Sequence, residues 1–239
     1  MLKRMDAARA RQLIADAATS PLTDPFVEYP GWYLQRWHFL PEGYLSRRSA
    51  AGYDHLIRNV YSAFQERRIT RAVLSLMRAS APREVLELGC GPGHLLRAVS
   101  QARIAQRVTG MDLSPFMLER AQQHNRAGVE LVHSSGLDLP WERPQFDAVV
   151  ASHYFGHLPE AARPTALAEA VRVLTPGGLL YVVDHAWHPP VSPATLTAHP
   201  EQRRVFGAIR LSVFERAPSP LHPPLQPATI YRERERSLA

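Results

Sequence analysis

Three glycines and one carboxylate are the residues of this chain whose types and spacing point most clearly to chemistry. The segment Val85–Leu96 reads VLELGCGPGHLL, so an apolar run ends in Gly89, Gly91 and Gly93 before helix-forming residues resume. Alternate glycines remove side chains from a short turn, so the backbone can approach a nucleotide-like ligand and the next helix directs its free N–H groups at it. Asp112 follows Gly93 by nineteen residues. We therefore expect a nucleoside site in which this carboxylate accepts hydrogen bonds from ribose hydroxyls.

Two histidines are candidates for proton transfer. His153 and His157 follow the apolar run Phe146–Ala151 in the segment ASHYFGH. Histidine titrates in the range that suits a general base, and the end of such a strand is where an open α/β sheet binds its ligands. The alternative is that His157 only caps the helix that follows. The neighbouring Ser152 is expected to line the ligand site.

A metal centre is not expected from the local spacing of ligand residues. The chain has 11 histidines but no H-E-x-x-H or comparable pairing, and its one cysteine, Cys90, cannot build a cysteine-based cluster. Cys90 lies between two of the glycines and is expected to be a small packing residue.

An aromatic segment precedes the glycine turn and is a candidate acceptor site. Seven aromatic residues lie within 21 positions: Phe26, Tyr29, Trp32, Tyr33, Trp37, Phe39 and Tyr44. We expect this segment to cover the nucleoside cleft, with Trp32, Tyr33, Trp37 and Tyr44 contacting an apolar, aromatic or cationic small molecule. The alternative is that these rings only pack the N-terminal helices together. Arg36, Arg47 and Arg48 are candidates to bind an acidic group on the acceptor.

The elements that position these residues follow an alternating pattern. Short apolar runs alternate with helix-like stretches from Arg83 to Asp184, as in a parallel sheet with crossover helices. The expected strands are 84–88, 107–111, 130–133, 146–151 and 179–184. Helices are expected at 93–101, after the N-cap pair Ser114-Pro115, and at 159–174, the last one ending at the turn 175–178. The predicted fold is a doubly wound, mostly parallel α/β sheet.

Three regions are predicted along the 239 residues. Residues 1–82 form an N-terminal helical and aromatic lid, with apolar residues at helical spacing at positions 56, 57, 60, 61 and 64 and again at 69, 73, 76 and 77. Residues 83–184 form the ligand-binding core. Residues 185–239 hold nine of the 21 prolines, which opposes central strands and long helices there. Only 201–216 looks helical in this last region.

The core motifs, taken in order, resemble the class I S-adenosylmethionine-dependent methyltransferases, and most of all their broad small-molecule branch. The residues that carry the resemblance are 87–93, Asp112, 139–141, 146–150, 157–160 and 169–178. The resemblance implies S-adenosylmethionine as cofactor. It also implies a set of cofactor-binding residues: Glu87, Gly89, Gly91, Gly93, Asp112, Leu113, Ser135, Gly136, Leu137 and Ser152.

Two departures from the family pattern affect the cofactor site and the sheet edge. Ser135 stands where the family has an aspartate that binds the adenine amino group, and a neutral acceptor forgoes on the order of 1 kcal/mol. Asp138 is the alternative acceptor. The family also ends its sheet with an antiparallel hairpin, for which the proline-rich region offers no good pair apart from an apolar piece within 205–214.

Charge and composition limit the remaining classes. The net charge is +6, but the basic residues, 27 arginines and Lys3, are scattered singly or in pairs, and SHYF at 152–155 differs from the N/D-P-P-Y/F of nucleic-acid amino-methyltransferases. No run approaches the roughly 18 to 20 apolar residues of a membrane span, and no secretory signal is recognised, so a cytoplasmic protein is expected. The predicted function is methyl transfer to O, N or C of a small molecule. The alternatives are a nucleotide-fold binding protein without turnover and an RNA or DNA methyltransferase, and the oligomeric state stays open.

Overall fold

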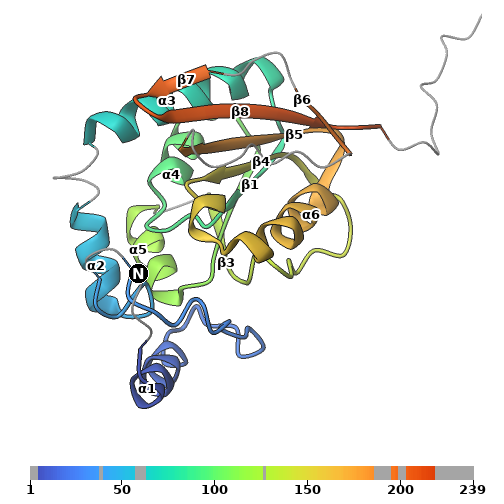
Figure 1. Ribbon diagram of the computed structural model, residues 1–239. Coiled ribbons are helices and arrows are strands. Elements are labelled where there is room, and N and C mark those ends of the chain that lie inside the picture. Colours follow the sequence, from blue (N-terminus) through green and yellow to red (C-terminus); the bar gives the residue numbers. More distant parts are fainter. Residues whose placement is uncertain are drawn as a thin grey trace, which may run out of the picture.

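A mostly parallel, eight-stranded sheet with helices on both faces forms the centre of the molecule (Figure 1). The structure is a computed structural model and describes residues 5–37, 40–56, 63–125, 128–185, 195–198 and 203–218. The helices are α1 (Ala7–Ala17), α2 (Arg47–Leu56), α3 (Ala63–Ser80), α4 (His94–Gln101), α5 (Pro115–His124) and α6 (Arg163–Val173), with 3-10 turns η2 (Phe155–His157) and η3 (Glu160–Ala162). The strands are β1 (Glu84–Leu88), β2 (Arg107–Asp112), β3 (Val129–His133), β4 (Phe146–Ser152), β5 (Leu174–His185), β6 (Leu196–Ala198), β7 (Arg203–Phe206) and β8 (Ile209–Arg216).

The order of the strands places the expected site. They run β3-β2-β1-β4-β5-β8-β6, with β7 also paired to β8. Strand β1 pairs in parallel with β2 on one side and with β4 on the other. The chain therefore builds the sheet outward in one direction from β1 to β3 and in the opposite direction from β4 onward, which makes the gap between β1 and β4 a topological switch point. Ligands of open α/β sheets bind at the carboxyl ends of the strands at such a switch point. The five predicted strands are confirmed, and so is the α/β class.

Helix α5 begins as its sequence predicts. Ser114 is the N-cap, its Oγ accepts the Met117 N–H at 3.2 Å, and Pro115 occupies the first turn. The turn expected at 175–178 is part of β5 instead. The register between β4 and β5 shifts beside it, and Gly177 there has a φ of 79°.

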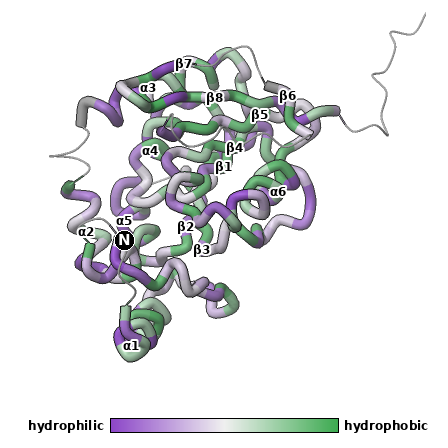
Figure 2. Tube along the Cα trace, viewed as in Figure 1, coloured by the Kyte–Doolittle hydropathy of each residue, from purple (hydrophilic) through white to green (hydrophobic). Residues whose placement is uncertain are grey.

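The helix predicted at 201–216 is wrong, because residues 203–206 and 209–216 are the strands β7 and β8. Strand β8 pairs antiparallel with β5 from Leu179↔Glu215 to His185↔Ile209. Hydrophobic and hydrophilic positions alternate along the first five residues of β8, from Ile209 to Val213 (Figure 2), which is the period of a strand rather than of a helix. The sheet therefore has an antiparallel edge after β5, which the proline content of this region argued against.

Two apolar layers cover the sheet. One joins α6 to residues of β1, β4 and β5, including Leu86, Val149 and Leu180. The other joins α3 and α4 to the opposite face, including Val85 and Val150. Successive residues of each strand thus serve opposite layers, as the two-residue period requires.

A third apolar cluster attaches the N-terminal segment to α5. Leu13 and Ala17 of α1 and Leu45 pack with Phe116 and Met117 of α5. Helices α1 and α2 lie at the end of the sheet next to α5 (Figure 1). Phe39 and positions 57, 60 and 61 of the predicted helical pattern lie outside the described residues. None of the described helices has the length and apolar character needed to cross a membrane.

Candidate active site

The glycine loop and Asp112 form one hydrogen-bonded unit at the carboxyl ends of β1 and β2. The Asp112 carboxylate accepts the Gly91 N–H at 2.9 Å and the Ser114 N–H at 2.8 Å. Gly91 has a φ of 52°, and a Cβ there would meet nothing within 4 Å, so the loop opens onto free space at this position. A glycine is favoured at this φ, and its missing side chain leaves the backbone accessible to a ligand.

Burial makes Asp112 an unusual carboxylate. It is 9% exposed, and burial raises its pKa to about 6, although N–H groups of Ser114, Gly91 and Leu113 lower it. A carboxylate can accept about four hydrogen bonds, and the side-chain contacts above use two of these sites. Asp112 also lines the cavity described next, where hydroxyl donors would stabilise its ionised form.

A cavity extends from this loop to the N-terminal segment. It encloses about 810 Å³, part of it open to solvent. The residues that line it are Trp32, Tyr33, Trp37, Tyr44, Tyr53, Gly89, Gly91, Met111, Asp112, Leu113, Met117, Ser135, Gly136, Leu137, Ser152, His153, Tyr154, His157 and Leu158. No lysine or arginine is among these described lining residues.

Two predicted cofactor residues lie outside this lining. Glu87 is 5% exposed and accepts a hydrogen bond from the Leu96 N–H, which belongs to the first turn of α4. The N-cap residue of α4, Gly93, provides no side-chain hydrogen bond to this helix. Burial raises the pKa of Glu87 to about 8, and the nearby Glu66 adds to the rise. Gly93 allows α4 to begin close to α5, since a Cβ there would lie 2.9 Å from the Ala121 Cβ. Both residues support the loop from behind the cavity.

The segment after β3 forms part of the cavity lining. Ser135, Gly136 and Leu137 all line the cavity, and the Ser135 Oγ accepts the Leu137 N–H at 3.2 Å. Asp138, the alternative acceptor for an adenine amino group, is exposed and is absent from the described lining. The geometry therefore favours Ser135 over Asp138 at this position.

The two candidate bases differ in their surroundings. His153 has a left-handed φ of 53°, and its pKa is lowered to about 4, chiefly by burial; Asp184 opposes this shift, while His185 and His157 add to it. His153 is therefore neutral near pH 7. The His157 Nδ1 lies at hydrogen-bond distance from the His153 carbonyl oxygen. A carbonyl only accepts, so Nδ1 carries the proton, and in the neutral ring Nε2 is then the acceptor nitrogen.

Aromatic rings of the N-terminal segment hold His157 in place. The centre of its ring lies 5.7 Å from the ring centre of Trp37 and 6.2 Å from that of Tyr44. The buried Tyr44 Oη has no hydrogen-bond partner. Burial raises the pKa of Tyr44, and the charges of Tyr53 and Asp112 add to this rise. This segment thus connects the glycine loop with the candidate base.

Not every predicted residue of the aromatic segment reaches the cavity. Phe26 is 90% exposed, and the Tyr29 Oη lies 3.3 Å from His133 Nε2 at the end of β3. Arg47 pairs with Glu119 and lies 4.8 Å from the centre of the Phe116 ring, so it is engaged away from the cavity. An anion-binding role for Arg47 has no support in this arrangement.

Some lining residues could not be singled out from the sequence. Tyr53 comes from α2, and Met117 from α5, where their spacing reads as ordinary helix packing. Tyr154 lies within the segment that carries the histidines, but only the structure shows its position. A Cβ on Gly89 would stand 2.8 Å from its Cδ2, and one on Gly136 would stand 2.8 Å from its Cζ. The Tyr154 ring thus fills the space between these two glycines.

Comparison with known proteins adds a family to this geometry. Residues 85–178 match a family model described as a methyltransferase domain. The chain is similar to the phthiotriol/phenolphthiotriol dimycocerosates methyltransferase of Mycobacterium leprae, at 36% identity over 43% of this chain and 37% of that protein. It is also similar to the demethylmenaquinone methyltransferase of Staphylococcus epidermidis, at 31% identity over 55% of each. The chain spans between 37% and 61% of the length of the curated relatives that it matches.

Solved structures share the fold. The N-methyltransferase NodS from Bradyrhizobium japonicum WM9, in complex with S-adenosyl-L-homocysteine, matches 71% of this chain and 95% of its own with a TM-score of 0.59 and 23% identity. A TehB-like SAM-dependent methyltransferase from Corynebacterium glutamicum matches 72% of this chain and 100% of its own with a TM-score of 0.58 and 23% identity. At such identities the likeness is one of fold.

Proposed function

We propose that this chain is a methyltransferase for small molecules, because residues 85–178 match a methyltransferase-domain model and the sheet has the fold of class I S-adenosylmethionine-dependent methyltransferases. The proposed reaction transfers a methyl group from S-adenosylmethionine to O, N or C of an apolar or aromatic acceptor. The observation that carries the proposal is the single cavity that joins Asp112 and the glycine loop to His157 and the aromatic segment.

The cofactor end of the cavity fits a nucleoside. Asp112 would accept the ribose hydroxyls, Gly91 would lie against the ligand, and Leu113 would contact the adenine, with Ser135 to Leu137 at its edge. The buried Asp112 carboxylate with unused acceptor capacity is the observation that supports this fit. When bound, S-adenosylmethionine supplies a methyl group that its sulfonium makes electrophilic.

The chain's own contribution is to position the acceptor and to exclude water. Holding two reactants in line can supply roughly 7 to 11 kcal/mol of the barrier. The aromatic residues Trp32, Trp37 and Tyr44 line this space, and the rings of Trp37 and Tyr44 also lie next to that of His157. An acceptor seated against these rings would lie beside a histidine that can take its proton.

We assign the role of general base to His157 rather than to His153. The bond from Nδ1–H to the His153 carbonyl selects the tautomer in which Nε2 accepts a proton. His153, with its pKa near 4, is a weak base at neutral pH, and its carbonyl orients His157. Ser152 would line the site beside them.

The lining also supports an acceptor class. The described lining holds aromatic and aliphatic side chains and no basic residue, which disfavours an acceptor whose carboxylate or phosphate must be buried there. Two similar proteins are named for a quinone and for a phenol-containing acceptor: a demethylmenaquinone methyltransferase and a phthiotriol/phenolphthiotriol dimycocerosates methyltransferase. We therefore favour a quinone- or phenol-like acceptor.

The proposal is tested by turnover with a methyl-labelled cofactor and a panel of phenols, quinones, amines and RNA. We expect label in a phenol or quinone product and none in RNA, with Asp112→Ala as the inactive control. Tight cofactor binding without transfer to any acceptor would instead identify a binding protein. Transfer to RNA would contradict the acceptor class.

A further inference from the structure

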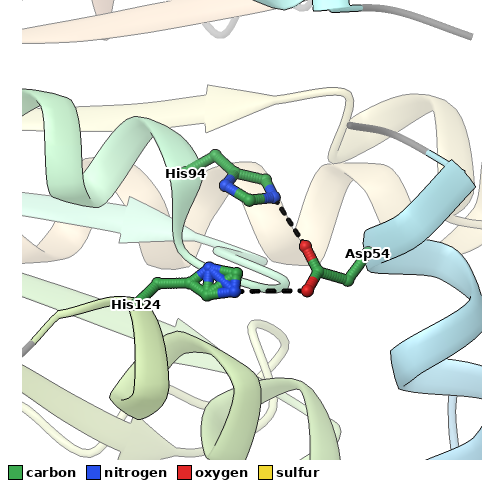
Figure 3. Close-up of side chains that lie close together, drawn as sticks. All are labelled: Asp54, His94 and His124. Atoms are coloured by element: carbon green, nitrogen blue, oxygen red, sulfur yellow. Dashed lines mark hydrogen bonds and ion pairs between the residues drawn. The ribbon is translucent and has the colours of Figure 1, made fainter. Parts of the chain in front are cut away.

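Away from the cavity, one carboxylate and two imidazoles meet between three helices (Figure 3). Asp54 of α2 lies 2.8 Å from the His94 Nε2 through its Oδ1 and 3.2 Å from the His124 Nε2 through its Oδ2. His94 begins α4 and His124 ends α5. The cavity lining described above includes none of the three. Both imidazoles therefore direct the same nitrogen toward one carboxylate.

The cluster is buried but can be reached from solvent. The Asp54 side chain is 1% exposed and that of His124 is 9%, whereas His94 retains 20%. A small ion could enter past His94, whereas a larger ligand would require the helices to separate. Carboxylate oxygen and imidazole nitrogen are together the ligand set that zinc and similar ions prefer.

The distances are close to those of a tetrahedral site. Metal bonds of about 2.0–2.2 Å place neighbouring ligand atoms about 3.3 Å apart. The two distances from Asp54, 2.8 and 3.2 Å, are both somewhat shorter than this value, and all the ligand atoms lie within 4.8 Å of one another. Binding one ion would require the side chains to shift, because His94 faces Oδ1 of Asp54 whereas His124 faces Oδ2.

Arg120 is the neighbour that a metal must tolerate. Its Nε and Nη2 both contact the Asp54 Oδ2, at 3.2 and 2.5 Å, and neither contacts Oδ1. Carboxylates that bind metals are commonly hydrogen-bonded on their outer side, so Arg120 can hold Asp54 in place while Oδ1 faces the ion. Its positive charge also repels a dication, so we expect micromolar rather than nanomolar affinity.

We propose that Asp54, His94 and His124 form a binding site for one divalent transition-metal ion of the zinc class. Three protein ligands leave one position for water. The sequence predicted no metal centre because these ligands are 40 and 30 residues apart and match no local spacing. The site would join α2 of the N-terminal lid to α4, which follows Gly93 directly, and to α5.

The test is calorimetric titration of the untagged, metal-free protein with zinc chloride, with cobalt(II) absorption as a second reading. His94→Gln and His124→Gln keep a side chain that can donate to Asp54 but bind zinc poorly. His55→Gln, on the exposed side of α2 next to Asp54, is the matched control. We expect one ion per chain in the wild type and the control. Losing an outer partner of a metal ligand already costs about 10–100-fold in affinity, so each of the other two variants should lose at least that.

Several results would overturn the proposal. A wild-type protein that takes up no zinc would show that the cluster is only a hydrogen-bonded ion pair network. Equal zinc uptake in all three variants would show an adventitious ion only. The cobalt spectrum of the wild type decides the question even where a variant fails to fold, because tetrahedral cobalt absorbs far more strongly than the hydrated ion. None of these readings requires methyl transfer, so they stand apart from the proposed function.

Discussion

The ring of Tyr154 occupies the place that a side chain at Gly136 would need. A Cβ on Gly136 would overlap the Tyr154 hydroxyl and lie 2.8 Å from its Cζ. The glycine after β3 and the tyrosine after β4 are thus complementary, although 18 residues separate them in the chain.

Gly136→Ala should destabilise the fold by about 1–3 kcal/mol, because the added methyl group forces the Tyr154 ring aside. Tyr154→Ala should remove most of that cost, so the two substitutions are not additive. The free energy of unfolding of the single and double variants, from urea denaturation, checks this. Gly31→Ala is the control, since a Cβ there meets nothing within 4 Å. Full additivity would show that the two residues are not in contact.

Cofactor affinity should fall as the pH drops below about 6. Burial raises the pKa of Asp112 to about 6, and below that pH the carboxyl is protonated and loses acceptor capacity for the ribose hydroxyls. The loss is at most about tenfold per pH unit. Calorimetric titration with S-adenosylhomocysteine between pH 5 and 8 measures it. Asp112→Asn should bind weakly with no such pH dependence, and a wild type that binds equally at pH 5 and 7.5 would contradict the assignment.

Glu87→Gln should stabilise the protein progressively as the pH rises from about 5 to 8. Burial raises the pKa of Glu87 to about 8, above its value in the unfolded chain. Between these two pKa values the folded protein keeps the Glu87 proton, whereas the unfolded chain releases it. The wild-type protein therefore loses stability as the pH rises from about 5 to 8, and the Gln variant does not. The difference in the free energy of unfolding should grow by up to about 1.4 kcal/mol per pH unit and then level off. Melting temperatures of both proteins across the pH range give the comparison. A constant difference would mean that Glu87 is ionised in the fold.

His157→Gln should lower kcat by roughly 10²-fold or more for an acceptor that must lose a proton. His153→Gln should cost less, because we propose His157 as the base and the backbone carbonyl that orients it remains. Both kcat and KM are needed, together with the cofactor dissociation constant, which neither change should alter. A larger loss of kcat in His153→Gln than in His157→Gln would indicate that His153, and not His157, is the general base.

Trp32→Ala combined with Trp37→Ala should raise the acceptor KM by about tenfold, because each aromatic contact contributes about 0.5–1.5 kcal/mol. The cofactor dissociation constant should change much less. Phe26→Ala removes a ring that is 90% exposed and is the matched control. Steady-state kinetics with the acceptor and cofactor varied in turn separate the two effects, and an equal change in both would mean that the rings only pack the lid.

Local signals account for what could be predicted from the sequence. The glycine loop, Asp112 and the Ser114 cap depend on residues close together in the chain, and their patterns predicted both the strands and several residues that line the cavity. Strand β8 was missed for two reasons: prolines lie on both sides of it, and hydrophobic and hydrophilic residues alternate over only a few of its positions. The cluster around Asp54 could not be found, because its members come from three helices and only the packing of α2 on α4 and α5 brings them together.

The position of β8 between β5 and β6 also has a consequence for folding during synthesis of the chain. The strand that completes the sheet is made about 25 residues after β5 ends, so β5 leaves the ribosome with its outer edge unpaired. An apolar strand edge of this kind invites pairing with other chains. A chain that is released after synthesis stops between residues 185 and 209 would therefore have an open sheet edge and be prone to aggregate, although strands β1 to β5 are already complete.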